Sequence, residues 1–215
     1  MEQANIVMIA VKLAAHYNQH ILKMQKVSKT KNPGGRLRKL SGDLGESLSK
    51  LAWTEVGKHY VKTHSISFES VKGDMRKIIA KNHSGHTMDL QVDRHQFIDG
   101  QLVHVEECKS YLDRCYMIRA SDDFRSIKKY CGCPISSSIL AIENCVKKES
   151  YDFIMDEGYV ETVSFLADGL RSSQKPIWKT QHYKSLNIQK VTSYVRRIAE
   201  VFEREIQKRT NNVLD

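Results

Sequence analysis

The segment over residues 88–111 constrains the fold of this chain more than any other stretch. It carries two apolar runs, over residues 92–98 and 102–108, on either side of Asp99-Gly100. An Asp-Gly pair between two strand-like runs is a strong signal for a tight turn, because both residues tolerate the positive φ that such turns need. The sequence therefore predicts a β-hairpin that ends in Glu107-Cys108-Lys109.

Hydrophobic periodicity predicts the elements around this hairpin. Apolar residues at helical spacing indicate helices over residues 4–25, 41–60, 111–130 and 186–208. Short apolar runs indicate strands over residues 66–72, 137–142 and 159–167. The basic segment 26–39 contains Pro33-Gly34-Gly35 and is expected to be a loop.

This order of elements indicates an α/β fold with a central mixed β-sheet flanked by helices. With 215 residues, the chain is expected to form a single domain over 1–215. Residues 1–40 form an N-terminal helix and basic arm, and residues 41–125 the core around the hairpin. Residues 126–215 supply the remaining sheet, a polar loop and the C-terminal helix.

Charge and composition narrow the class of partner. The net charge of +9 favours a polyanion, with nucleic acid first. No apolar stretch approaches the roughly 18–20 residues that cross a bilayer, so we expect no membrane partner. No signal peptide is visible, and the five cysteines follow no regular spacing, so reduced thiols in a cytoplasmic protein are expected.

The hairpin carries residues suited to phosphodiester hydrolysis. Asp89 and Asp93 have the same parity, so a regular strand puts both carboxylates on one face. Glu107 and Lys109 likewise share a face of the next strand. Carboxylates are the hard oxygen ligands that Mg²⁺ prefers, and a bound metal polarises phosphate and activates water. A neighbouring lysine orients the nucleophile or stabilises the charge that builds on the phosphate, so these residues predict a magnesium site.

The register of the hairpin decides whether this site assembles. With a regular two-residue turn, Asp93 pairs with Glu106, and Glu107 and Lys109 then face the opposite side. We therefore predict a bulge or a longer turn, because only Glu107 has a lysine two residues further on. The sequence leaves open whether Asp89 or Asp93 is the main metal ligand.

The pattern resembles the active site of the PD-(D/E)XK nuclease superfamily, which includes type II restriction endonucleases and archaeal Holliday-junction resolvases. Gly45-Glu46 ahead of the hairpin and Ser84-Gly85 before the aspartates add to this resemblance, which covers about residues 41–125. One departure is Met88, which precedes Asp89 where the motif has proline.

The resemblance implies a restriction-endonuclease-like core and a role for each matching residue. Asp89 and Glu107 correspond to metal ligands, Lys109 to the catalytic lysine, and Glu46 to an auxiliary ligand. Periodicity offers Glu55 as an alternative to Glu46, because Glu55 falls inside the apolar stripe of its helix.

Further residues are candidates for DNA contact because they are basic or carry hydroxyls. They follow the motif, or lie in the polar segment 168–187 or the basic segment 26–39. These candidates are Ser110, Tyr111, Arg114, Arg119, Arg171, Ser172, Ser173, Lys175, Lys179, Arg36 and Arg38.

The leading hypothesis is a Mg²⁺-dependent, sequence-specific endonuclease for double-stranded DNA, of the type II restriction class. Cleavage of a palindromic duplex needs two active sites, so a homodimer is expected, with the first or last helix at the interface. One alternative is a structure-specific nuclease such as a Holliday-junction resolvase. Another is a non-catalytic nucleic-acid-binding protein.

Overall fold

The fold is built on a five-stranded mixed sheet in the order β1-β4-β5-β6-β7. The computed structural model describes residues 1–81, 84–131, 134–170 and 183–212. The strands of the sheet are β1 (Phe68–Lys72), β4 (Arg94–Ile98), β5 (Gln101–Leu112), β6 (Ser136–Asn144) and β7 (Thr162–Phe165). β1, β4 and β5 pair antiparallel, whereas β5, β6 and β7 pair parallel.

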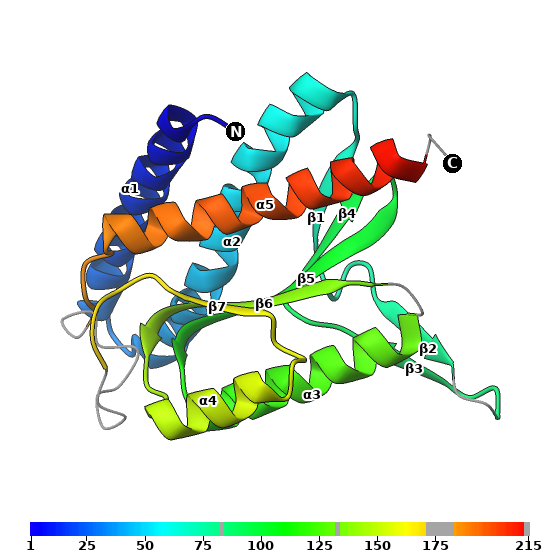
Figure 1. The fold of residues 1–215 in the computed structure, drawn as a ribbon. Coiled ribbons are helices and arrows are strands. Elements are labelled where there is room, and N and C mark those ends of the chain that lie inside the picture. Colours follow the sequence, from blue (N-terminus) through cyan, green and yellow to red (C-terminus); the bar gives the residue numbers. More distant parts are fainter. Residues whose placement is uncertain (82–83, 132–133, 171–182, 213–215) are drawn as a thin grey trace.

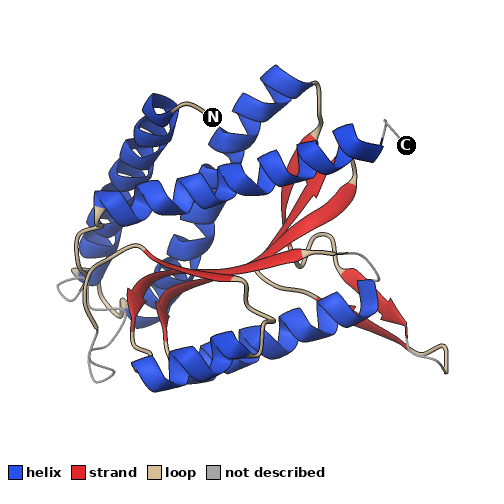
Figure 2. Ribbon diagram, in the orientation of Figure 1, coloured by secondary structure: helices blue, strands red, loops and turns tan. Residues whose placement is uncertain are grey.

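Helices cover both faces of this sheet (Figure 1; Figure 2). α1 (Gln3–Ser28), α2 (Gly34–His64) and α5 (Ile188–Asn212) lie on one side, and α3 (Arg114–Cys131) and α4 (Lys148–Asp156) on the other. Each layer buries its own apolar cluster, one around Trp53 and Phe202 and the other around Phe124 and Ile139. The expected α/β class, with helices flanking a central mixed sheet, is confirmed.

The expected loop over residues 26–39 is wrong. α1 continues to Ser28 and α2 begins at Gly34, so only five residues connect the two helices. Pro33 stands at the N-cap of α2, where its missing N–H costs nothing. Leu37 is buried and anchors this first turn. Arg36 and Arg38 are therefore exposed residues of a helix and not of a flexible arm.

The predicted helix over 111–130 begins later than expected, because β5 runs on to Leu112. Tyr111 therefore belongs to a central strand that pairs with β6. Asp113 ends the strand and starts α3, since its Oδ1 accepts a hydrogen bond from the backbone N of Tyr116 at 2.9 Å.

A second, two-stranded sheet was not predicted as a separate unit. β2 (Ile78–Lys81) and β3 (Thr87–Leu90) form a small antiparallel ribbon beside α3 (Figure 1). Asp89 lies in β3, whereas Asp93 lies after it and directly before β4. The expectation that Asp89 and Asp93 share one face of one strand is wrong, because the chain leaves the ribbon after Leu90. α4 was also not predicted.

The hairpin has the tight turn and the irregularity that the sequence predicts. Ile98 pairs with Gln101 across Asp99-Gly100, and these two turn residues have φ of 47° and 78°. The register shifts between Gln96 and Phe97, which pair with His104 and Leu102. Val103 is therefore an extra residue in β5, and the predicted bulge is confirmed.

Gly73, just after β1, allows the chain to pass close to the segment that leads into Asp93. Its backbone N donates to Asp93 O at 3.2 Å, and a Cβ at this position would lie 1.8 Å from Val92 O.

We expect Gly73→Ala to lower the free energy of unfolding by about 1–3 kcal/mol, because the backbone must move to relieve the overlap of the added Cβ with Val92 O. Urea unfolding measures this. Gly34→Ala is the control, since nothing lies within 4 Å of its added Cβ; equal stability of the two variants contradicts the account.

Candidate active site

Asp93, Glu107 and Lys109 converge beside the centre of the sheet. Lys109 Nζ lies 3.2 Å from Asp93 Oδ2 and also forms an ion pair with Glu107 Oε1. Asp93 Oδ2 accepts a hydrogen bond from the backbone N of Cys108 at 2.7 Å. Glu107 Oε2 accepts one from the backbone N of Asp93 at 3.2 Å. The backbones of the two chain segments thus hold the two carboxylates against one lysine.

The bulge explains this convergence. Beyond Val103 the ladder pairs Arg94 with Glu106, one residue later than a regular hairpin gives. Asp93 therefore falls opposite Glu107 and on the same side of the sheet. Because side chains alternate along a strand, Lys109 projects to that side as well.

Burial and a neighbouring like charge disfavour the ionised form of Glu107. Burial, and then the charge of Asp93, raise the pKa of Glu107 above its usual value, and the pull of Lys109 only partly offsets this. Burial works to lower the pKa of Lys109, but the charges of Glu107 and Asp93 outweigh it and raise that pKa. In this arrangement Lys109 is a cation that contacts both carboxyl groups.

A cavity of about 440 Å³ opens beside the pair, and its lining is strongly acidic. The carboxylates that line it belong to Glu46, Asp74, Asp89, Asp93, Glu107 and Asp123, against the cations Lys72 and Arg119. Six carboxylates against two cations make the lining of this cavity negative, although the chain as a whole has a net charge of +9.

Glu46 borders this cavity from α2. Its carboxylate forms an ion pair with Lys72 at 2.7 Å, and its side chain stays partly exposed. Glu55, the alternative suggested by periodicity, instead pairs with Lys12 and Lys58 at 2.6 Å each. Of these two glutamates, only Glu46 lines the cavity together with Asp93 and Glu107.

Asp89 does not join the other carboxylates. It is exposed on β3 and pairs with Lys77 at 2.7 Å, although it borders the same cavity. Across the described ranges, no group of three or more His, Cys, Asp or Glu side chains has the spacing to hold a metal ion. The structure therefore brings Asp93, and not Asp89, to Glu107 and Lys109.

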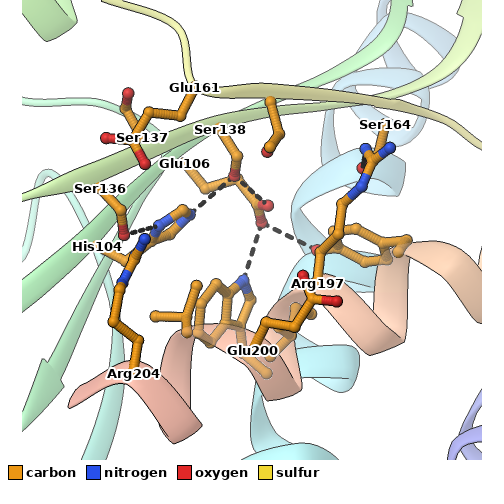
Figure 3. Close-up of a pocket in the computed structure, with 15 residues that line it drawn as sticks. His104, Glu106, Ser136, Ser137, Ser138, Glu161, Ser164, Arg197, Glu200 and Arg204 are labelled. Atoms are coloured by element: carbon orange, nitrogen blue, oxygen red, sulfur yellow. Dashed lines mark hydrogen bonds between the residues drawn. The ribbon is translucent and has the colours of Figure 1, made fainter. Parts of the chain in front are cut away.

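Glu106 occupies the opposite face of β5, where sequence reasoning assigned it no role. Ser49 Oγ, Trp53 Nε1 and Tyr194 OH donate to its Oε2 at 2.5, 3.1 and 3.0 Å, and Ser138 Oγ donates to Oε1 at 2.8 Å. Figure 3 shows Glu106 beside Ser138 and His104, among the residues that line a pocket with Arg197 and Arg204 of α5. Burial raises the pKa of Glu106, and the four donors oppose that shift.

His104 extends this interior network. Its Nδ1 lies 2.7 Å from Ser136 Oγ and its Nε2 lies 2.8 Å from Ser138 Oγ (Figure 3). Burial, with smaller contributions from Arg204 and Lys128, lowers the pKa of His104 to about 3, so the ring is neutral. One sequence signal points to this network: with the bulge at Val103, alternation along β5 puts His104 and Glu106 on the same face of the strand. The partners in this network come from α2, β6 and α5 and have no signature of their own.

The candidate DNA-binding residues divide into three groups. Arg36, Arg38, Arg114 and Arg119 are exposed, and Tyr111 is half-buried. Ser110 is buried, and its hydroxyl donates to the backbone oxygen of Ser41, so it fastens β5 to α2 instead of facing solvent. The remaining candidates lie outside the described residues: Arg171, Ser172, Ser173, Lys175 and Lys179.

Comparison with known proteins gives no relative: no family model matches the chain, and a search of curated proteins finds no match. None of the helices in the described ranges is both long enough and apolar enough to cross a membrane.

The two neighbouring glutamates of β5 should respond to substitution in opposite ways. Glu106→Ala leaves four buried donors without their acceptor, so we expect a loss of about 3 kcal/mol or more in unfolding free energy. Glu107→Gln removes a like charge beside Asp93, so stability should be unchanged or higher. Urea unfolding of both variants measures the difference, and a larger loss for Glu107→Gln contradicts the assignment of the two faces.

Proposed function

We propose that this chain is a metal-dependent DNA endonuclease with a PD-(D/E)XK-type site in a restriction-endonuclease-like core. The observation that carries the proposal is the convergence of Asp93, Glu107 and Lys109 beside an acidic cavity. Two carboxylates and a lysine at the end of a hairpin are the groups that metal-assisted phosphodiester hydrolysis needs. The net charge of +9 supports a polyanionic substrate.

The donor set fits Mg²⁺. Asp93 and Glu107 offer hard carboxylate oxygens, and Mg²⁺ is commonly held by one or two carboxylates together with waters and substrate phosphate. Glu46, which lines the same cavity, is the auxiliary candidate. When bound, Mg²⁺ supplies Lewis-acid polarisation of the phosphate and a water of lowered pKa.

The protein's own groups have separate tasks in this proposal. Asp93 and Glu107 would hold the metal. The backbone N of Cys108 donates to the carboxylate of Asp93 and the backbone N of Asp93 to that of Glu107, and these bonds fix both groups in place. Lys109 lies next to both and supplies a positive charge where negative charge builds on the phosphoryl oxygens. The partial burial of the site strengthens that interaction relative to water.

Within this class we propose sequence-specific cleavage of double-stranded DNA by a homodimer, as in type II restriction. The exposed arginines Arg36, Arg38, Arg114 and Arg119 provide backbone contacts. The outer side of α1 exposes Val7, Met8, Val11 and Leu22 at helical spacing, which supports the first helix as the dimer interface. The alternative of a structure-specific nuclease shares the same site and differs in substrate.

Cleavage of supercoiled plasmid and of a branched DNA junction tests this function. We expect cutting with Mg²⁺ or Mn²⁺, none with excess chelator, and a loss of at least about a hundredfold in rate for Lys109→Ala. Lys58→Ala, an exposed lysine on α2, is the matched control and should cut at the wild-type rate.

The products separate the candidate functions. Discrete plasmid fragments support a restriction enzyme, and cleavage confined to the junction supports a structure-specific nuclease. No cleavage by the wild-type protein with either metal overturns the enzymatic proposal and leaves a nucleic-acid-binding protein. Full activity of Lys109→Ala overturns the site even if cleavage occurs.

A further inference from the structure

A second cavity, of about 190 Å³, adjoins the acidic one and has a different lining. The two cavities share Glu46 and Asp93, so they are neighbouring parts of one site. The second cavity adds Lys109, Arg38 and two tyrosines to those carboxylates. It therefore combines cationic and aromatic walls directly beside the proposed catalytic lysine.

The aromatic wall is formed by Tyr111 of β5 and Tyr116 of α3. Their rings meet edge to face, with centroids 5.7 Å apart and planes at 78°. Lys109 Nζ lies 5.7 Å from the centroid of the Tyr116 ring. The Asp113 cap fixes the backbone of Tyr116, while the side chain of Tyr116 remains exposed enough to meet a ligand. Burial, with smaller effects from Tyr116, raises the pKa of Tyr111 to about 12, so this phenol is neutral.

Helix α2 also contributes to the lining of this cavity, in part through Gly42. A Cβ on Gly45 would lie 3.2 Å from the backbone N of Lys109, so α2 packs tightly on β5 there. One helical turn earlier, at Gly42, a Cβ would meet nothing within 4 Å. Helix α2 is thus packed against β5 at Gly45, whereas at Gly42, which lines the cavity, it leaves open space. The volume of the cavity exceeds the roughly 150 Å³ that is enough to hold a benzene ring in a protein cavity.

We propose that this cavity binds one nucleobase, turned out of its stack onto Tyr116, from the nucleotide next to the cleaved phosphate. Bases of every kind stack on aromatic side chains, and the same cavity is lined by the cations Lys109 and Arg38, which suit the adjoining phosphates. The inference rests on the proposed nuclease function and specifies how one nucleotide of the DNA substrate is held. Unstacking costs least for a mismatched or single-stranded nucleotide, so such a nucleotide at the cleavage position should favour binding and cutting.

Binding without turnover tests the cavity independently of activity. The probe is a short single-stranded oligonucleotide that carries one 2-aminopurine, titrated with protein in Ca²⁺ and followed by fluorescence. We expect Tyr116→Ala to weaken binding by roughly tenfold to hundredfold, because stacking of one base is lost. Tyr116→Phe restores the ring and should recover most of the affinity.

Filling the cavity provides a second variant that does not depend on Tyr116. Gly42→Trp places an indole in the open space, and we expect at least a tenfold loss of oligonucleotide affinity. Gly34→Trp is the matched control on the same helix, since it too meets nothing within 4 Å, and should bind as the wild type does. Thermal unfolding of all four variants shows that each is folded before its affinity is compared.

The outcomes separate this inference from the proposed function. If the wild-type protein cuts DNA while Gly42→Trp and Tyr116→Ala bind and cut as it does, the nucleobase site is wrong and the nuclease stands. If the oligonucleotide binds with the expected losses but no DNA is cut, the site stands and the nuclease is wrong. Faster cutting of a duplex with a mismatch at the cleavage position than of the matched duplex supports both.

Discussion

One extra residue in β5 determines which side chains meet at the centre of this molecule. The extra residue Val103 shifts the pairing of β5 with β4 by one position. Because successive side chains of a strand face opposite sides, the shift changes the face on which each residue after Val103 meets its neighbours on β4. Glu106 is turned toward Trp53 and Tyr194, where four donors satisfy it. Glu107 is turned toward the other side, where it contacts Asp93 and Lys109.

These two environments give two adjacent residues of one strand, Glu106 and Glu107, opposite surroundings. The Glu106 carboxylate joins α2, β6 and α5 through hydrogen bonds and therefore stabilises the layer on its face. The Asp93–Glu107 pair has the opposite character, since burial and mutual repulsion raise the pKa of Glu107. Titratable groups with such perturbed pKa values cluster at functional sites, which is why the proposed function places a divalent cation here.

The sequence predicted those parts of the site that depend on local pattern. Asp99-Gly100 indicated the turn, and the Glu107–Lys109 spacing required the bulge that β5 contains. The sequence did not reveal that β3 pairs with β2. Polar and apolar residues alternate from Asp89 to Asp93 in the same way whether the segment is one continuous strand or the ends of two separate strands. It also placed a loop at Pro33-Gly34-Gly35, where packing of Leu37 extends α2. The partners of Glu106 come from α2, β6 and α5, and only the folded chain brings them together.

Metal binding by aspartate variants is the most direct test of the central claim that Asp93, Glu107 and Lys109 form one metal site. Isothermal titration with Mn²⁺ compares the wild-type protein with Asp93→Asn and Asp89→Asn, two substitutions of the same chemistry four residues apart. The geometry predicts at least a tenfold loss of affinity for Asp93→Asn, since it removes one of two ligands. Asp89→Asn should bind within about twofold of wild type, because that carboxylate pairs with Lys77. Loss of Mn²⁺ binding by Asp89→Asn with retention by Asp93→Asn contradicts the account.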